Sequence, residues 1–286
     1  MKIRELEIRP ISLGEMMFPM EVAYREGQNP GLYDGVTFLQ AAKEGYLLAE
    51  VEGKPIGAAA GAVYGGRLAY LGGVFTLPPF RHKGLGRKLW EICLSAAEKA
   101  VGDGVIGVNG LPEKEDFYTG YDFWPSHMVL CYKGRIFEES CLGFDIYPAS
   151  EVDPIALEVY DGQVFGAPRQ EFLRCWLEQP GLETACLVEK GLLKGYGCMR
   201  RCREGWRLGP VFAREPRAAE KILKHLACKT AGEPAMLELP EPNQEAVRLA
   251  FRLGMFPAGV RRRFYKGGPP AFPLEQIYGY TTLDIG

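Results

Sequence analysis

The strongest constraint on the fold of this sequence is that one order of secondary-structure signals occurs twice. Each half holds a hairpin, a further strand, an amphipathic helix and a short apolar strand, in that order. In the first half these segments are 46–64, 68–76, 85–101 and 105–108. In the second half they are 183–201, 206–212, 217–229 and 235–239, followed by a last helix that begins at Asn243 and ends at Gly254. A matched order over about 80 residues predicts two copies of one α/β (α+β) fold, each a mixed, mostly antiparallel sheet flanked by helices.

The length agrees with two domains. The chain has 286 residues, about twice the usual size of a single domain. With 47% apolar and 24% charged residues, it has the ordinary balance of a globular protein. We therefore expect one domain over 1–140 and a second over 141–286, with the connector near 138–154.

Charge and cysteine usage exclude several classes of protein. The net charge is −2, and a nucleic-acid-binding protein would carry a basic excess. There is no apolar run long enough to span a membrane, and residues 1–7 lack the apolar core of a signal peptide, so we expect a cytoplasmic protein. Eight cysteines without a Cys-x-x-Cys pair, together with only three histidines, predict reduced, mostly buried thiols and no metal site.

The segment with the clearest chemistry joins the strand at 68–76 to the helix at 85–101. The first amides of a helix have no intrahelical acceptor, and the helix dipole favours negative charge there. Gly84 and Gly86 carry no side chain that would block an anion, and basic residues surround them: Arg81, Lys83, Arg87 and Lys88. Residues 81–87, which we call the phosphate cradle, are therefore predicted to bind a phosphate or pyrophosphate. The alternative is that these glycines serve packing alone and the basic side chains are only solvated.

The cradle fits neither the P-loop nor the dinucleotide-binding Gly-x-Gly-x-x-Gly pattern. Instead, Arg81-His82-Lys83-Gly84-Leu85-Gly86, preceded by Val74-x-Thr76-x-Pro78, resembles the signature of the GNAT superfamily of N-acetyltransferases. Phe117-Tyr118 resembles the aromatic pair that opens a later helix in these enzymes. The whole chain resembles a bacterial subgroup in which a GNAT domain precedes a degenerate GNAT-like domain. It departs from the family at Asp122, where members usually have glycine.

The resemblance implies that the first domain binds acetyl-CoA as cosubstrate, without a metal. The implied coenzyme A contacts are Val74, Phe75, Thr76, Arg81, His82, Lys83, Gly84, Leu85, Gly86 and Arg87. The strand backbone at 71–76 would bind the pantetheine amides, the cradle would bind the pyrophosphate, and amides near 74–76 would stabilise the oxyanion. Asn109 is a further candidate for contact with cofactor or substrate, with a structural role in a turn as the alternative.

Tyr118 is the candidate general acid that protonates the leaving thiolate, since a phenol is a suitable donor to that group. The alternative is a packing role for its ring. A general base is not identified, because residues 70–75 contain no carboxylate. Four carboxylates remain open as bases acting through a water: Glu50, Glu113, Glu115 and Asp116.

The second half lacks the cradle. Its junction at 209–217 has no Gly-x-Gly, and Glu215 would repel phosphate, so we expect no usual coenzyme A site there. Arg261-Arg262-Arg263 lies in a predicted strand and is expected to alternate in exposure; alternatively, one of these arginines lines an acidic-substrate pocket between the domains. Trp124, Trp176 and Trp206 are expected in the core.

These features predict an N-acetyltransferase that moves an acetyl group from acetyl-CoA to a primary amine by direct attack in a ternary complex. The acceptor, a small molecule or a peptide, is not identified by the sequence, because acceptor pockets lie on variable loops. A homodimer is left open. The alternative is a non-catalytic acyl-CoA-binding sensor or interaction protein, which the missing strand carboxylate favours.

Overall fold

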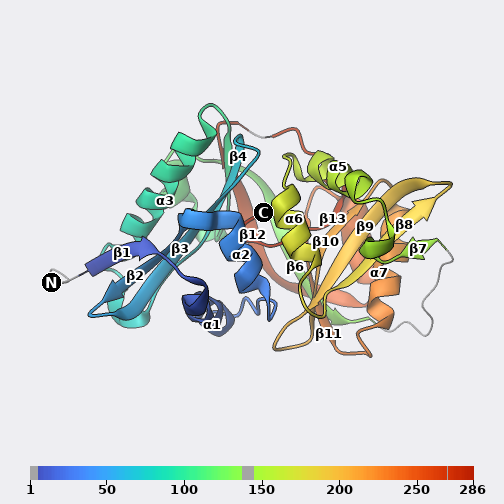
Figure 1. Cartoon of the computed structure of the whole chain (residues 1–286), viewed down its shortest axis with the longest axis horizontal. Coiled ribbons are helices and arrows are strands. Elements are labelled where there is room, and N and C mark those ends of the chain that lie inside the picture. Colours follow the sequence, from blue (N-terminus) through green and yellow to red (C-terminus); the bar gives the residue numbers. More distant parts are fainter. Residues whose placement is uncertain (1–5, 137–144, 269) are drawn as a thin grey trace.

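The computed structural model describes residues 6–136, 145–268 and 270–286, and its two halves lie side by side (Figure 1). The first half contains β1 (Leu6–Pro10), α1 (Met17–Arg25), α2 (Asp34–Ala42), β2 (Tyr46–Val51), β3 (Lys54–Tyr64), β4 (Leu68–Thr76), α3 (Leu85–Val101), β5 (Val105–Gly110), α4 (Glu115–Thr119) and β6 (Trp124–Arg135). The second half contains β7 (Ile146–Tyr147), α5 (Pro154–Phe165), α6 (Gln170–Leu177), β8 (Glu183–Glu189), β9 (Leu192–Arg201), β10 (Trp206–Ala213), α7 (Pro216–Cys228), β11 (Pro234–Pro240), α8 (Gln244–Arg252), β12 (Met255–Lys266) and β13 (Ile277–Gly279).

The predicted boundary at residues 140 and 141 lies outside the described residues, as do Cys141 and part of the predicted connector. The division into 1–140 and 141–286 therefore stays a prediction.

The repeated order of elements is confirmed. In the first half, β2, β3 and β4 form an antiparallel meander, and α3 connects β4 to the parallel strand β5. In the second half, β8, β9 and β10 form the meander, and α7 connects β10 to the parallel strand β11. Both crossover helices are amphipathic, as their apolar spacing requires, and their buried faces pack on these strands.

The last strands of the two halves are exchanged. The sheet order is β1-β2-β3-β4-β5-β12-β6-β11-β10-β9-β8-β7, so β12 of the second half lies beside β5 and β6 of the first half lies beside β11. Phe264 of β12 is paired with Val108, and Tyr132 of β6 is paired with Leu237. The two exchanged strands also pair with each other, antiparallel, from Met255↔Gly134 to Tyr265↔Trp124. Each half thus supplies a strand that extends the other half's sheet.

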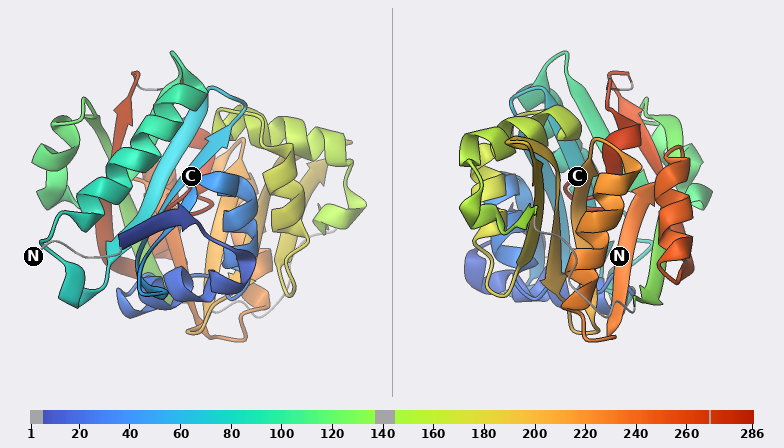
Figure 2. Two further views of the ribbon diagram at one scale, coloured as in Figure 1. Left: turned by 60° about the vertical axis from the view of Figure 1, so that its left-hand side comes forward. Right: turned by 90° about the vertical axis from the view of Figure 1, so that its right-hand side faces the viewer.

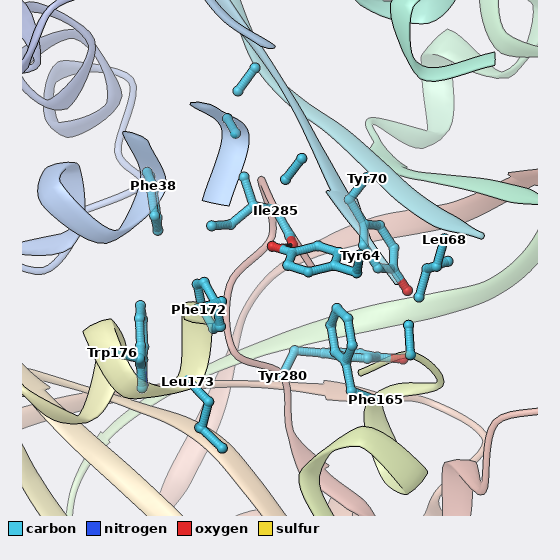
Figure 3. Packing of buried hydrophobic residues seen from close by; sticks show 14 of the residues in the cluster. Phe38, Tyr64, Leu68, Tyr70, Phe165, Phe172, Leu173, Trp176, Tyr280 and Ile285 are labelled. Atoms are coloured by element: carbon cyan, nitrogen blue, oxygen red, sulfur yellow. Dashed lines mark hydrogen bonds between the residues drawn. The ribbon is translucent and has the colours of Figure 1, made fainter. Parts of the chain in front are cut away.

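Three hydrophobic clusters hold the layers together. One lies between α3 and the first half of the sheet, and a second lies between the second half and the helices α7 and α8. Figure 2 shows α3 lying along the strands of its half. The third cluster lies between the halves and includes Phe38 of α2, Trp176 of α6 and Ile285. In Figure 3 Tyr64 and Tyr70 lie in this cluster with Phe165 and Tyr280.

The tryptophans do not all lie in the core as predicted. Trp176 is fully buried and Trp206 is half-buried, but Trp124 is 71% exposed, so the prediction is wrong for Trp124. Trp124 begins β6 and pairs with Tyr265 of β12, and the first three residues of β6 are all exposed.

Candidate active site

The site is built around an opening between β4 and β5. The two strands pair in parallel from Leu68↔Val105 to Leu71↔Val108. Within the described residues, β5 pairs with no residue of β4 beyond Leu71, and a bulge follows in the pairing of β4 with β3. Gly73, at this bulge, has φ +58°, a conformation that favours glycine. The half of β4 that the family resemblance assigns to pantetheine therefore diverges from its neighbour.

The predicted strand contacts lie in this diverging half. Val74 and Phe75 are half-buried, and Thr76 is 9% exposed. The ring of Phe75 packs 6.1 Å from that of Phe18 of α1. Helix α1 thus covers part of β4 beside the opening.

The phosphate cradle lies at the N-terminus of α3. Gly84 is the N-cap residue with φ +82°, and a Cβ built there would meet nothing within 4 Å. Leu85 is buried under the helix, whereas Gly86 is half-buried and Arg87 is exposed. Among the described residues, the backbone amides of His82 to Arg87 meet no hydrogen-bond acceptor. The helix start therefore presents unpaired donors to water, as an anion site requires.

The side chains of the cradle have different surroundings. Arg81 donates from Nε to the carbonyl oxygen of Thr76 at 3.0 Å and forms an ion pair with Glu26 at 2.6 Å. Lys83 donates to the carbonyl oxygen of Pro79 at 2.6 Å. His82 is exposed with φ +59°. Arg81 therefore fixes the loop to β4 and α1, and the backbone amides are the groups left available for an anion.

Tyr118 lies on α4, at the β5 side of the opening. A Cβ at Gly110, the last residue of β5, would lie 2.2 Å from Cε2 of Tyr118, so the ring packs directly on this backbone. The ring also packs on Phe264 and Trp90. Burial raises the pKa of Tyr118, and the nearby Arg261 opposes the rise. The phenol consequently keeps its proton near neutral pH.

The turn after α4 accommodates the departure from the family pattern. Asp122 has φ +63°, the left-handed conformation expected of the glycine that it replaces. Asp is one of the residues that tolerate this conformation.

Asn109 uses its side chain within the protein. Its Oδ1 accepts from Nε of Arg263 at 2.7 Å, and its Nδ2 donates to the carbonyl oxygen of Leu283 at 2.8 Å. These are the contacts of a structural residue, and contact of Asn109 with cofactor or substrate stays a prediction.

The carboxylates considered as bases do not gather at the opening. Glu50 lies on β2, two strands away from β4, where it accepts from Arg9 at 2.9 Å. Glu115 forms an ion pair with Arg262 at 2.6 Å. Glu113 and Asp116 are exposed on the segment around α4.

The corresponding opening in the second half is filled by the chain itself. Strand β10 pairs with β11 only from Trp206 to Leu208, and β13 then pairs with Val211 and Phe212 of β10. Helix α7 begins with Pro216 after the N-cap residue Glu215. Backbone groups that could bind a pantetheine in this half are thus occupied, and the helix start presents a carboxylate and a proline.

Beyond β13, residues 280–286 enter the opening of the first half, a contact that was not predicted from the sequence. Asp284 Oδ1 accepts from the amide of Gly73 at 3.1 Å. A Cβ at Gly72 would lie 2.2 Å from the carbonyl oxygen of Asp284, so only glycine permits this approach. The double glycine in an otherwise apolar strand was the one signal that another backbone would approach here. Figure 1 shows this end of the chain between the two halves.

A cavity between the halves adjoins this contact. Its lining comes from the loop between α1 and α2, from α2 itself, from the strands β6, β9, β10, β11 and β12, and from residues 282–284. Two buried ion pairs contribute to it: Asp34 with Arg200 at 2.9 Å, and Glu238 with Arg207. Arg261 lines it as well, whereas an acidic substrate for this cavity stays a prediction. The expected alternation of exposure along the arginine run is wrong, because Arg261 and Arg262 are both half-buried. Arg263 is instead fully buried among aromatic rings.

The described residues contain no group of three or more His, Cys, Asp or Glu side chains arranged to hold a metal ion. Within the same residues, no helix is both long and apolar enough to cross a membrane.

Comparison with known protein families identifies the class of protein. Residues 15–109 match the acetyltransferase (GNAT) family, and residues 157–279 match an acetyltransferase (GNAT) domain. The chain belongs to the GNAT superfamily in its tandem form and is an acyltransferase.

Individual relatives extend over the whole chain. The holothin acyltransferase of Pseudoalteromonas sp. (strain SANK 73390) is 24% identical over 97% of this chain and 94% of its own length. A putative acetyltransferase from Pyrococcus horikoshii has a TM-score of 0.83 at 19% identity, covering 100% of this chain and 98% of its own. A tandem GNAT protein from the clavulanic acid biosynthesis pathway, solved without AcCoA, has a TM-score of 0.62 at 17% identity, with 93% and 99% covered. At these identities the two structures establish a shared fold.

Proposed function

We propose that the chain transfers an acetyl group from acetyl-CoA to a primary amine, which attacks the thioester directly in a ternary complex. The observation that carries this proposal is the cradle at the start of α3, where the amides of 82–87 meet no acceptor among the described residues. The diphosphate of coenzyme A would accept from these amides, and the diverging half of β4 would bind the pantetheine. The filled opening of the second half supports a single cosubstrate site per chain.

Two groups at the opening support the chemistry of the transfer. Amides near Val74 to Thr76 would donate to the carbonyl oxygen as it gains charge. Tyr118, whose pKa is raised by burial, holds a proton that it would donate to the departing coenzyme A sulfur. Holding amine and thioester in line, away from water, would supply much of the remaining rate gain.

We infer that the acceptor is a small amine bound in the cavity between the halves, because this cavity reaches the opening at Asp284. A peptide amine would have to enter the same cavity with an extended end.

Isothermal titration calorimetry with acetyl-CoA tests the binding step, and we expect saturable binding with one site per chain. Release of free coenzyme A thiol, followed over a panel of primary amines, tests the transfer. Absence of acetyl-CoA binding would refute the proposal. Binding without thiol release for any amine would favour the alternative of a non-catalytic acyl-CoA sensor.

A further inference from the structure

The reaction proposed above needs a group that accepts a proton from the attacking amine, and β4 does not provide one. Residues 70–75 contain no carboxylate. An amine that is protonated in water must lose a proton before its lone pair can attack, so a base near the diverging half of β4 is required. The base must therefore come from a segment that reaches β4 from elsewhere in the chain.

One carboxylate reaches it. Asp284 accepts from the amide of Gly73 at 3.1 Å, and its backbone packs against Gly72. Gly73 directly precedes the residues whose amides face the acyl carbonyl in the proposed reaction. Asp284 also lines the cavity between the halves. The carboxylate thus stands between the acceptor cavity and the proposed oxyanion site.

The other acidic groups that line the cavity are not available as bases. Asp34 is bound to Arg200, and Glu238 is bound to Arg207. Burial raises the pKa of the Cys131 thiol to about 12, so this thiol stays protonated and is no base. Among the described carboxylates that line the cavity, Asp284 alone forms no ion pair with an arginine or lysine.

We propose that Asp284 is the general base of the transfer and that it binds the ammonium group of the acceptor in the cavity. This inference rests on the proposed function. A buried carboxylate without a cationic partner is unfavourable, and the acceptor ammonium would provide that partner. Burial raises the pKa of Asp284, while the Gly73 amide, Arg207 and Arg261 oppose the rise, so the group is suited to take up a proton and release it.

The acceptor R–NH3⁺ gives one proton to Asp284, and the amine lone pair forms the N–C bond to the acyl carbon. The C–S bond then breaks, its electron pair goes to sulfur, and Tyr118 protonates the thiolate. The second proton leaves the nitrogen and returns to the Tyr118 phenolate, directly or through water. The products are the amide, coenzyme A thiol and one proton that passes from Asp284 to water.

The test compares two substitutions. Asp284→Asn keeps the shape of the side chain and the oxygen that accepts from the Gly73 amide. If Asp284 had only a structural role, this variant would therefore stay active. We expect kcat of Asp284→Asn to fall by about 100-fold or more, the usual contribution of a general base, with the Kd of acetyl-CoA unchanged. Asp284→Ala should lose activity in the same way and regain part of it when formate is added. Asp103→Asn, which removes an exposed carboxylate, is the matched control and should be as active as the wild type.

Calorimetry with acetyl-CoA on both variants verifies that fold and cradle are intact. An undiminished kcat in Asp284→Asn would overturn the assignment, as would an Asp284→Ala variant that binds acetyl-CoA but is not rescued by formate. A wild-type chain that releases no thiol with any amine would overturn the proposed function and the assignment together.

Discussion

Substitution of Gly84 tests whether backbone amides at the start of α3 bind the diphosphate. Gly84 has φ +82°, and every L-residue in the left-handed region is strained by about 1–2 kcal/mol. A Cβ there meets nothing within 4 Å, so Gly84→Ala and Gly84→Glu share this strain and add no steric clash with the chain. The two variants therefore differ in the charge that they place in the cradle.

The magnitude follows from Coulomb's law. A carboxylate held about 4 Å from one phosphate charge repels it by about 1 kcal/mol in water and about 4 kcal/mol at an effective dielectric constant of 20. The Kd of acetyl-CoA should then be about 5- to 1000-fold higher for Gly84→Glu than for Gly84→Ala.

Calorimetry at two salt concentrations measures this ratio, which should shrink at high salt because the site is exposed. Thermal unfolding of both variants verifies that they lose the same stability. Equal Kd values for the two variants would refute the diphosphate assignment.

Three further predictions concern other parts of the molecule. Tyr118→Phe should slow amine-dependent thiol release by about 100-fold without changing the Kd of acetyl-CoA, and an unchanged rate would remove Tyr118 from the role of acid. Burial lowers the pKa of His127 to about 4, so the folded protein takes up this proton at lower pH than the unfolded chain does. About 3 kcal/mol of stability that is present above pH 6.5 should therefore be lost as the pH falls toward 4. Urea unfolding at both ends of this range should show the loss in the wild type but not in His127→Gln. Arg200→Met leaves Asp34 buried without its partner and should lower the free energy of unfolding by about 3–5 kcal/mol. Glu171→Gln, which removes an exposed ion pair, should change it by less than about 1 kcal/mol, and similar losses in both variants would contradict the reasoning.

The parts of the fold that sequence reasoning predicted are those that depend on neighbouring residues. The spacing of Leu85, Leu89 and Cys93 is a local pattern, and it predicted a helix that begins and ends as α3 does. The glycines of the cradle were recognised because their effect lies within a few residues. Asp122 keeps the turn that a glycine would make, because its backbone adopts the same conformation.

The parts that were missed depend on distant pairings. The exchange of β6 and β12 joins residues far apart in the chain, and the apolar pattern of a strand does not identify the neighbour with which it pairs. The contact of Asp284 with Gly73 likewise has no signature at Asp284 itself. A glycine pair in a strand indicates close approach by some backbone, but does not say which one. The cavity between the halves is formed by these long-range contacts. The position of Arg261 beside a cavity could therefore be only one of two alternatives for the arginine run when the sequence alone was considered.

The exchanged strands also bear on how the chain is made. Ribosomes deliver β5 long before β12, whose Phe264 pairs with Val108, so β5 emerges without the neighbour that finally covers its edge. An uncovered strand edge is a template for pairing with other nascent chains. The first half therefore cannot finish folding until β12 has been synthesised, and the proposed acetyl-CoA site beside β5 matures only when that strand arrives.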